Sequence, residues 1–362
     1  MKSFTSSFAA FALALLPAAV SSAAQYTVTD LGTLGGAFSG GLAINDNGQV
    51  TGVATTNAVI NGVSVSHAFS YYGAMRDLGT LGGTYGEGFG VNASGQVVGS
   101  STTAGDVALH AFLYTGGAMQ DLGTLGGTFS SGNGINASGH VAGYSSTSGD
   151  VADHAFLYDG TMHDLGTFGG TISRGLAIND SGEVTGGAYT NGDVDEHAFL
   201  YTGGMMHDLG KGSLGQGIND SGQVVGSSGT PDGHVHAFLY TGGVMHDLGT
   251  LGASDSEARG INDIGQVVGW NGMGGGAAFL YDSVHGMVDL NSLIVSSSGW
   301  DLTGALAINN AGQITGEGTI GGQTHAFLLT PVPEPSTWAL LAMGGAALLL
   351  VGRRKIKVAR PN

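Results

Sequence analysis

Residues 154–170 read HAFLYDGTMHDLGTFGG and combine residue types that could do chemistry. His163 stands next to Asp164, and such a pair can bind a metal ion or transfer protons. The glycine-rich turn that follows is of a kind that can cradle phosphate. A catalytic residue needs only one specially placed copy, so the first question is how often the chain repeats this stretch.

Short strings of this stretch recur along the chain. Ile/Val-Asn-Asp/Ala/Asn-x-Gly occurs seven times at spacings of 40 to 47 residues, with its Asn at positions 45, 92, 136, 179, 219, 262 and 309. His-Ala-Phe and Asp-Leu-Gly each occur six times, with a degenerate seventh copy. The periodic His and Asp are therefore predicted to be structural. We expect the His to bond to neighbouring backbone and the Asp to cap the next turn, and we assign no catalytic residue.

Each repeat unit is predicted to be a meander of four short strands. The chain has 69 glycines, and Gly disfavours a helix by about 1 kcal/mol per position relative to Ala. Asn-Asp-Ser-Gly and Thr-Gly-Gly supply the tight turns. The string His-Ala-Phe-Leu-Tyr is apolar on both faces, as expected for sheets that stack face to face. Units of this length with four strands are typical of β-propeller blades.

The two ends of the repeat region complement each other. Residues 26–32 form a lone fourth strand, and residues 307–328 supply three strands without a fourth. Joined, they complete a seventh blade, and closing a ring removes an exposed sheet edge. We therefore predict an all-β, seven-bladed propeller closed by the N-terminal strand, rather than an open solenoid.

Charge and composition exclude several classes of function. Between residues 25 and 330 there are four basic and 26 acidic residues, so the surface repels nucleic acid and anionic lipid. The chain has no cysteine, which excludes disulfides and thiolate metal sites. The catalytic strings Gly-x-Ser-x-Gly and His-Glu-x-x-His are also absent, and the glycines around Lys211 do not fit a phosphate loop.

Both termini are predicted to be sorting segments that flank a repeat domain at residues 25–330. Residues 1–24 combine Lys2, an apolar run and small residues before a cleavage point at Ala24, as a secretory signal peptide does. In the tail, residues 331–362, the string Pro333-Glu334-Pro335 precedes an apolar run at 337–351 and a basic cluster at 353–357. That run is short for a stable membrane span, and the basic cluster should stay in the cytoplasm.

Two resemblances follow from these strings. The His-Ala-Phe and Asp-Leu-Gly-Thr-Leu-Gly-Gly units resemble the HAF-repeat family of bacterial extracellular proteins, which implies an exported repeat protein. The tail resembles the PEP-CTERM sorting signal, which implies processing by signal peptidase and an exosortase, transient anchoring in the inner membrane, and delivery to the cell surface or extracellular matrix. An ordinary single-helix anchor is the alternative for the tail.

Function is expected where the repeat breaks, in the links between second and third strands. Four links carry acids, and together with Trp270, a candidate sugar-stacking platform, they are predicted to form an acidic rim. The rim residues are Asp106, Asp150, Asp153, Asp193, Asp195, Glu196 and Asp232. We assign no metal site and no cofactor, although Ca²⁺ is a candidate ligand of the rim; the alternative is a solvated surface that serves solubility. The loop 291–303 around Trp300 is either a binding loop or a packing loop.

We therefore expect a non-enzymatic structural or interaction module that engages exopolysaccharide or a surface protein. The alternative is a carbohydrate-active enzyme, a hydrolase or lyase working at one face of the propeller. Such an enzyme needs two carboxylates about 5–10 Å apart in one pocket. The acids are instead spread around the predicted rim, which favours binding over catalysis.

Overall fold

The computed structural model describes residues 26–60, 62–272 and 276–332. Within these ranges the regular structure is β-strand apart from three short 3-10 turns, η1 (Ala104–Asp106), η2 (Leu290–Leu293) and η3 (Ser296–Ser298). The predicted all-β class is confirmed.

The strands group into four-stranded antiparallel meanders. The first strands are β2 (Gly35–Ile44), β6 (Gly82–Val91), β10 (Gly126–Ile135), β14 (Gly169–Ile178), β18 (Ser213–Ile218), β22 (Ser256–Ile261) and β26 (Trp300–Ile308). The second strands are β3 (Val50–Ile60), β7 (Val97–Thr103), β11 (Val141–Thr147), β15 (Val184–Thr190), β19 (Val224–Gly229), β23 (Val267–Asn271) and β27 (Ile314–Ile320). The third strands are β4 (Val63–Tyr71), β8 (Leu109–Thr115), β12 (Asp153–Tyr158), β16 (Glu196–Thr202), β20 (Val235–Thr241), β24 (Ala277–Asp282) and β28 (Gln323–Pro331). The fourth strands are β5 (Met75–Gly79), β9 (Ala118–Asp121), β13 (Met162–Gly166), β17 (Met205–Lys211), β21 (Val244–Asp247), β25 (Gly286–Asp289) and β1 (Tyr26–Asp30).

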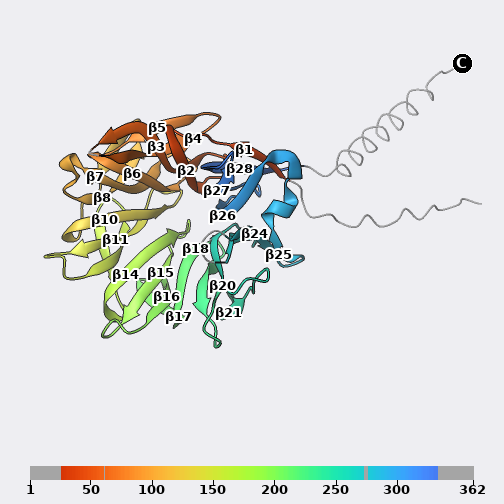
Figure 1. Ribbon diagram of the computed structural model, residues 1–362. Helices are drawn as coiled ribbons and strands as arrows, with labels where there is room; N and C mark the ends of the chain where they lie inside the picture. The colour runs from red at the N-terminus through yellow and green to blue at the C-terminus, as the bar shows by residue number, and fades with distance from the viewer. Residues whose placement is uncertain (1–25, 61, 273–275, 333–362) are drawn as a thin grey trace, which may run out of the picture.

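The meanders follow one another around a common centre (Figure 1). Strand pairing joins 20 strands into one sheet and leaves β18–β21 and β22–β25 as separate four-stranded sheets. Each first strand continues into the Asn string, and the ends of all the first strands line cavities at the centre. The first strands therefore determine which side chains reach the centre.

The two ends of the described chain lie side by side. Strand β1 pairs antiparallel with β28, with Tyr26 opposite Pro331 and Asp30 opposite Phe327. Tyr26 is 3% exposed and packs in the same apolar cluster as Phe327. Burial raises the pKa of the Tyr26 hydroxyl to about 12, with the charge of Asp282 adding to the effect. The first strand was predicted to complete the meander of the last three strands, and its pairing with β28 is as predicted.

The Asn string builds the turn between first and second strands. The Oδ1 of Asn45 accepts hydrogen bonds from the backbone N–H groups of Asn47 (3.0 Å) and Gln49 (2.9 Å). Gly48 closes the turn at φ +77°, a conformation that glycine adopts without steric strain. Because the same residue types recur in each copy, the turn recurs with them.

A glycine in each second strand leaves room beside it for the phenylalanine ring of His-Ala-Phe. A Cβ added at Gly52 would lie 1.9 Å from the carbonyl oxygen of Gly40 and 3.0 Å from the Phe69 ring, so no larger residue fits. The phenylalanines of all copies are at most 1% exposed. They are Phe69, Phe112, Phe156, Phe199, Phe238, Phe279 and Phe327. These rings form the repeated core.

The His of His-Ala-Phe bonds to a carboxylate and not, as predicted, to backbone. In the opening stretch, the Nδ1 of His154 lies 2.8 Å from Asp164 on the fourth strand. An oxygen of Asp164 also accepts from the Gly166 N–H at 2.8 Å, which is the predicted turn cap. Five further pairs follow the same pattern, and one of them, His325 with Asp30, joins β28 to β1. The periodic His and Asp are structural.

The loop 291–303 packs against the core. Trp300 meets Phe327 edge to face with ring centroids 6.1 Å apart. Asn291 exchanges two hydrogen bonds with the backbone of Leu302, at 2.7 and 3.0 Å. The packing interpretation of this loop is thereby favoured over a binding loop.

Candidate functional site

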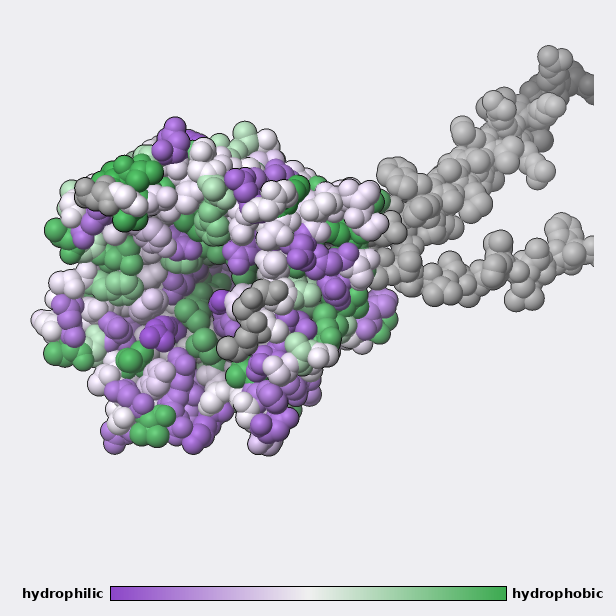
Figure 2. All heavy atoms as spheres, viewed as in Figure 1, coloured by the Kyte–Doolittle hydropathy of each residue, from purple (hydrophilic) through white to green (hydrophobic). Residues whose placement is uncertain are grey.

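Three cavities lie in series along the centre of the meanders. One of about 250 Å³ is lined by the Asn strings, and one of about 520 Å³ lies at the other side. A third, of about 250 Å³, shares lining residues with both and therefore lies between them. Figure 2 shows a face that is hollowed near its middle, where apolar residues are visible within a largely polar surface.

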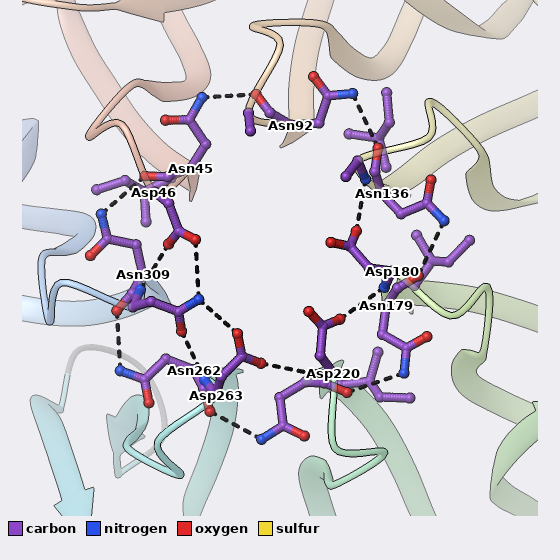
Figure 3. A pocket seen from close by; sticks show the side chains of 18 of the residues that line it. Asn45, Asp46, Asn92, Asn136, Asn179, Asp180, Asp220, Asn262, Asp263 and Asn309 are labelled. Carbon is purple, nitrogen blue, oxygen red and sulfur yellow. Dashed lines mark hydrogen bonds between the residues drawn. The ribbon is translucent and has the colours of Figure 1, made fainter.

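The Asn strings form a circuit of hydrogen bonds that we call the amide ring. Each Asn side chain donates from Nδ2 to the backbone carbonyl of the Asn in the next unit, at 2.8 to 3.2 Å, and Asn309 donates to Asn45 (Figure 3). The ring comprises Asn45, Asn92, Asn136, Asn179, Asn219, Asn262 and Asn309, each at most 6% exposed. The ring holds neighbouring units together; it leaves these amides little capacity for a ligand.

Four aspartates surround the opening beside the amide ring. Asp46, Asp180, Asp220 and Asp263 each accept a backbone N–H from the preceding unit, at 2.8 to 3.0 Å. Burial raises the pKa of Asp220, and the charges of the other three raise it further. Across residues 26–60, 62–272 and 276–332, no cluster of three His, Asp or Glu side chains is placed to hold a metal ion.

The 520 Å³ cavity, which we call the axial cavity, is walled by three positions of the repeat. These lie five and three residues before the ring Asn and eight residues after it. The lining residues are Leu42, Glu87, Phe89, Ser131, Asn133, Tyr144, Arg174, Leu176, Gln216, Arg259, Trp270, Leu306 and Glu317. The volume suits a small molecule or one to two sugar rings. The backbone geometry of these three positions repeats in each unit. Their side chains differ in charge, size and polarity from unit to unit.

One wall of the axial cavity is a network around Arg259. Its guanidinium carbon lies 4.2 Å from the centre of the Trp270 ring, and its Nε is 3.2 Å from Glu257. Gln216 links the two, accepting from Arg259 and donating to Glu257. Arg259 thus occupies one face of Trp270, the residue predicted to stack on a sugar.

Another part of the wall holds Arg174, which has fewer partners. Its guanidinium lies 5.8 Å from the centre of the Tyr144 ring, and its Nη1 is 3.7 Å from Oε1 of Glu196. That separation exceeds hydrogen-bond distance. Oε1 of Glu196 is buried without a hydrogen bond from any described residue. This wall therefore carries unused donors, and the unpartnered oxygen of Glu196 lies buried behind it.

Burial perturbs the carboxylates in the wall of the axial cavity, Glu87 and Glu317, and Glu196 behind it. It raises the pKa of Glu87, and the hydrogen bond that Tyr85 donates offsets only part of this. Burial likewise raises the pKa of Glu317 and of Glu196, partly offset by Arg259 and Arg174 respectively. Carboxylates that hold protons more tightly than usual are common at functional sites, although structural burial gives the same effect.

We expect Glu87→Gln to stabilise the protein at neutral pH. Because the folded-state pKa of Glu87 lies above its unfolded value, the folded state binds an extra proton between the two, and stability falls as pH rises through that window. Gln removes the free-energy cost of burying an ionised carboxylate, and its side-chain oxygen still accepts the hydrogen bond from the Tyr85 hydroxyl. Thermal unfolding should show a Tm about 1–3 °C above wild type at pH 7 and no gain at pH 4. Asp301→Asn, at an exposed position, controls for net charge; an equal gain there contradicts the prediction.

Two solved structures resemble most of the chain. The β-propeller domain of the trilobed protease from Pyrococcus furiosus, whose topology is described as an open velcro, matches with TM-score 0.55 at 8% identity, over 82% of this chain and 96% of that one. The acylaminoacyl peptidase of Pyrococcus horikoshii matches with TM-score 0.53 at 10% identity, over 86% of this chain. The chain spans 55% of the length of that peptidase. At such identities the likeness shows the fold alone. The fold is β-propeller-like.

The tail matches a family model, the PEP-CTERM protein-sorting motif, over residues 331–355. The chain carries this sorting motif. It indicates an exported, surface-directed protein that an exosortase processes, as the sequence predicted. No curated protein matches the chain.

Several sequence predictions fall outside the described residues. These are the cleavage point at Ala24, the string Pro333-Glu334-Pro335 and the apolar run 337–351. Within the described part of the chain, no helix has the length and apolar character needed to cross a membrane.

Three aspartates of the predicted acidic rim act as clamps inside their own units. Asp106, Asp150 and Asp193 adopt φ of 53 to 55°, and each accepts the backbone N–H of a threonine on the first strand at 2.7 Å. Hydrogen bonds from the Thr102 hydroxyl and then the Thr84 N–H lower the pKa of Asp106, and those from Thr171 lower the pKa of Asp193. Each carboxylate ties the link between second and third strands to the first strand, so a local structural role accounts for all three.

The other rim residues do not converge on one point. Asp153 accepts from the Ser146 hydroxyl at 2.6 Å, Asp195 lies 3.0 Å from Lys211, and Asp232 accepts from Thr230. Only Trp270 lines the axial cavity, and Glu196 lies behind Arg174.

We expect Asp150→Ala to lower Tm by about 2–4 °C, because the Thr128 N–H and hydroxyl lose their acceptor. The loss should be the same in 1 mM EDTA and in millimolar CaCl₂, since the carboxylate acts within the protein. Asp232, which accepts a hydrogen bond from the nearby Thr230 hydroxyl and does not tie its link to a first strand, gives the matched control Asp232→Ala, with a smaller loss. A calcium-dependent Tm in the wild type that disappears in Asp150→Ala contradicts this role.

Sequence reasoning missed most of the axial cavity. The variable functional residues were predicted in the links between strands. The charged residues of the cavity wall lie instead on strands; they are Glu87, Arg174, Arg259 and Glu317. Superimposing the copies on the ring Asn would have shown charged and aromatic residues at positions that are Gly, Ser or aliphatic in other copies. The signal was present in the sequence.

Proposed function

We propose that the chain is a seven-bladed β-propeller closed by β1, which is exported to the cell surface or matrix and there binds a saccharide in its axial cavity. The pairing of β1 with β28 and the return of the amide ring to Asn45 support the closed, seven-bladed form. Transient anchoring by residues 337–351 fits the sorting motif. The proposed role is non-enzymatic and needs no cofactor.

One observation supports the binding role: at the axial cavity wall the backbone geometry repeats while the side chains change from unit to unit. Selection for stability alone favours the same good residue in each unit, as at the buried Phe and Asn positions. Polar, charged and aromatic groups converging on one cavity are typical of a ligand site. Exopolysaccharide is the ligand class that suits a surface-directed protein with an aromatic and hydrogen-bonding pocket.

Binding is tested with full-length protein, purified in detergent, on an array of neutral and acidic oligosaccharides. We expect at least one to bind, and Leu176→Trp, which fills the cavity, to abolish that binding. Val284→Trp is the control, since Val284 is 82% exposed. Binding that survives Leu176→Trp, or no binding by the wild type, overturns the proposal; a bound surface protein in its place favours the interaction-module alternative.

A carbohydrate-active enzyme is the second candidate, favoured by two carboxylates in one cavity. Glu87 and Glu317 both line the axial cavity, and burial raises the pKa of each, as a general acid requires. Release of reducing ends from an oligosaccharide that binds would favour this candidate. Glu87→Gln and Glu317→Gln should then abolish release and leave binding within a few-fold of wild type.

A further inference from the structure

Resting on the proposed saccharide site, we propose that the axial cavity selects a carboxylated sugar, a uronate, through Arg174. The argument begins with the distribution of charge. Only four basic residues lie between positions 25 and 330, and two of them, Arg174 and Arg259, line this one cavity. In a chain with 26 acids in the same segment, that concentration gives the cavity a local chemistry unlike the rest of the surface.

The two arginines differ in how far the protein satisfies them. Arg259 donates from Nη1 to Gln216 and lies against Glu257 and the Trp270 ring, and its Nε is buried without a hydrogen bond to any described residue. Arg174 forms no hydrogen bond to any described residue, and its side chain is 38% exposed. A guanidinium presents a planar fork of N–H donors that matches a carboxylate. Arg174 is therefore the group free to receive one.

Glu196 lies behind Arg174, outside the lining of the axial cavity. A Cβ added at Gly187 would lie 2.6 Å from Oε1 of Glu196, so this carboxylate occupies the space where other units place Tyr144, Trp270 or Glu317. A purely structural Arg–Glu pair normally closes to about 2.7–2.9 Å. Here the two stay 3.7 Å apart, and Oε1 of Glu196 is buried without a partner. The pair therefore leaves the N–H groups of Arg174 available to an acceptor bound in the cavity.

A uronate supplies such an acceptor, the carboxylate on C5. A neutral hexose has a hydroxymethyl group there and no acid. A phosphorylated sugar carries up to two charges and would meet the nearby carboxylates Glu87 and Glu317, which disfavour it. The apolar wall of Leu42, Leu176 and Leu306 suits the C–H face of a sugar ring.

The test is calorimetric titration of full-length protein with cellobiose and with the β-1,4-linked glucuronate disaccharide, which differs from it by carboxylates in place of hydroxymethyl groups. We expect the uronate to bind at least 10-fold more tightly. Arg174→Gln should weaken uronate binding by about 10- to 100-fold and cellobiose binding by less than 3-fold. Arg76→Gln removes an equal charge from β5, outside the cavity, and should leave both affinities unchanged.

The outcomes separate the two proposals. Cellobiose binding that equals or exceeds uronate binding, or an Arg174→Gln variant with wild-type uronate affinity, overturns the uronate inference and leaves the saccharide site standing. Equal losses in Arg174→Gln and Arg76→Gln also overturn it, because they indicate a general charge effect. No binding of either disaccharide, together with a blank array, overturns the proposed function itself.

Discussion

Deletion of residues 25–32 lowers Tm by about 10 °C or more, or prevents folding. The deletion removes β1 and with it five strand-paired residues, the His325–Asp30 pair, and the side chains of Tyr26 and Leu31, which are 3% and 4% exposed. Burying each of those two side chains contributes about 1.5–3 kcal/mol, and the ladder of β28 loses its hydrogen bonds as well. A loss of about 5 kcal/mol is a large part of the stability of a typical domain.

Thermal unfolding of the full-length protein measures this effect. The matched control is Thr27→Ala/Thr29→Ala, which changes the exposed face of the same strand and should cost less than about 2 °C. If the deletion changes Tm no more than the control does, β1 plays no part in closing the structure, and the closed propeller is refuted.

Asn136→Asp destabilises the protein by about 2–4 kcal/mol at pH 7. Asn136 is 4% exposed, and its Oδ1 accepts from the N–H groups of Ser138 and His140, roles that Asp retains. The Nδ2 donation to the Asn179 carbonyl, at 3.2 Å, is replaced by a carboxylate oxygen facing another oxygen. The substitution thus isolates the bond between units from the turn within a unit.

Denaturant unfolding at pH 7 and pH 4 provides the measurement. Protonation restores a donor toward the Asn179 carbonyl, so the loss should be smaller at pH 4. Asn47→Asp is the control: Asn47 also donates to the next unit, to the Ala93 carbonyl at 3.0 Å, but it is exposed and should cost under about 1 kcal/mol. Equal losses for the two variants would mean that burial of the amide ring contributes nothing.

Much of the fold could be predicted from the sequence because the same short motifs recur in every unit. The Asn string marks each first turn, His-Ala-Phe each third strand, and Asp-Leu-Gly each fourth strand. A strand that is ambiguous in one copy can therefore be assigned from the other copies. The partner of the His could not be predicted. The bond between His154 and Asp164 depends on the register of third and fourth strands, which neither string encodes by itself.

The candidate site was harder to predict for a different reason. In a strand, alternate residues face opposite sides, and the sequence does not say which side faces the centre. Arg174 and Glu87 look like surface residues on polar first strands until the first strands are placed around a common centre. The rim aspartates drew attention because they stand in loops, yet Asp106, Asp150 and Asp193 serve the backbone.

The amide ring has a consequence for how such a chain can evolve. Tandem units grow easily by duplication, because each new copy brings its own strands and turns. Here every Asn amide points to the next carbonyl in the same rotational sense, and the last returns to the first. An eighth copy would have to widen the whole circle or leave a buried amide without a carbonyl. We therefore expect the ring to oppose the addition of a unit, whereas substitutions at the axial wall leave the ring intact.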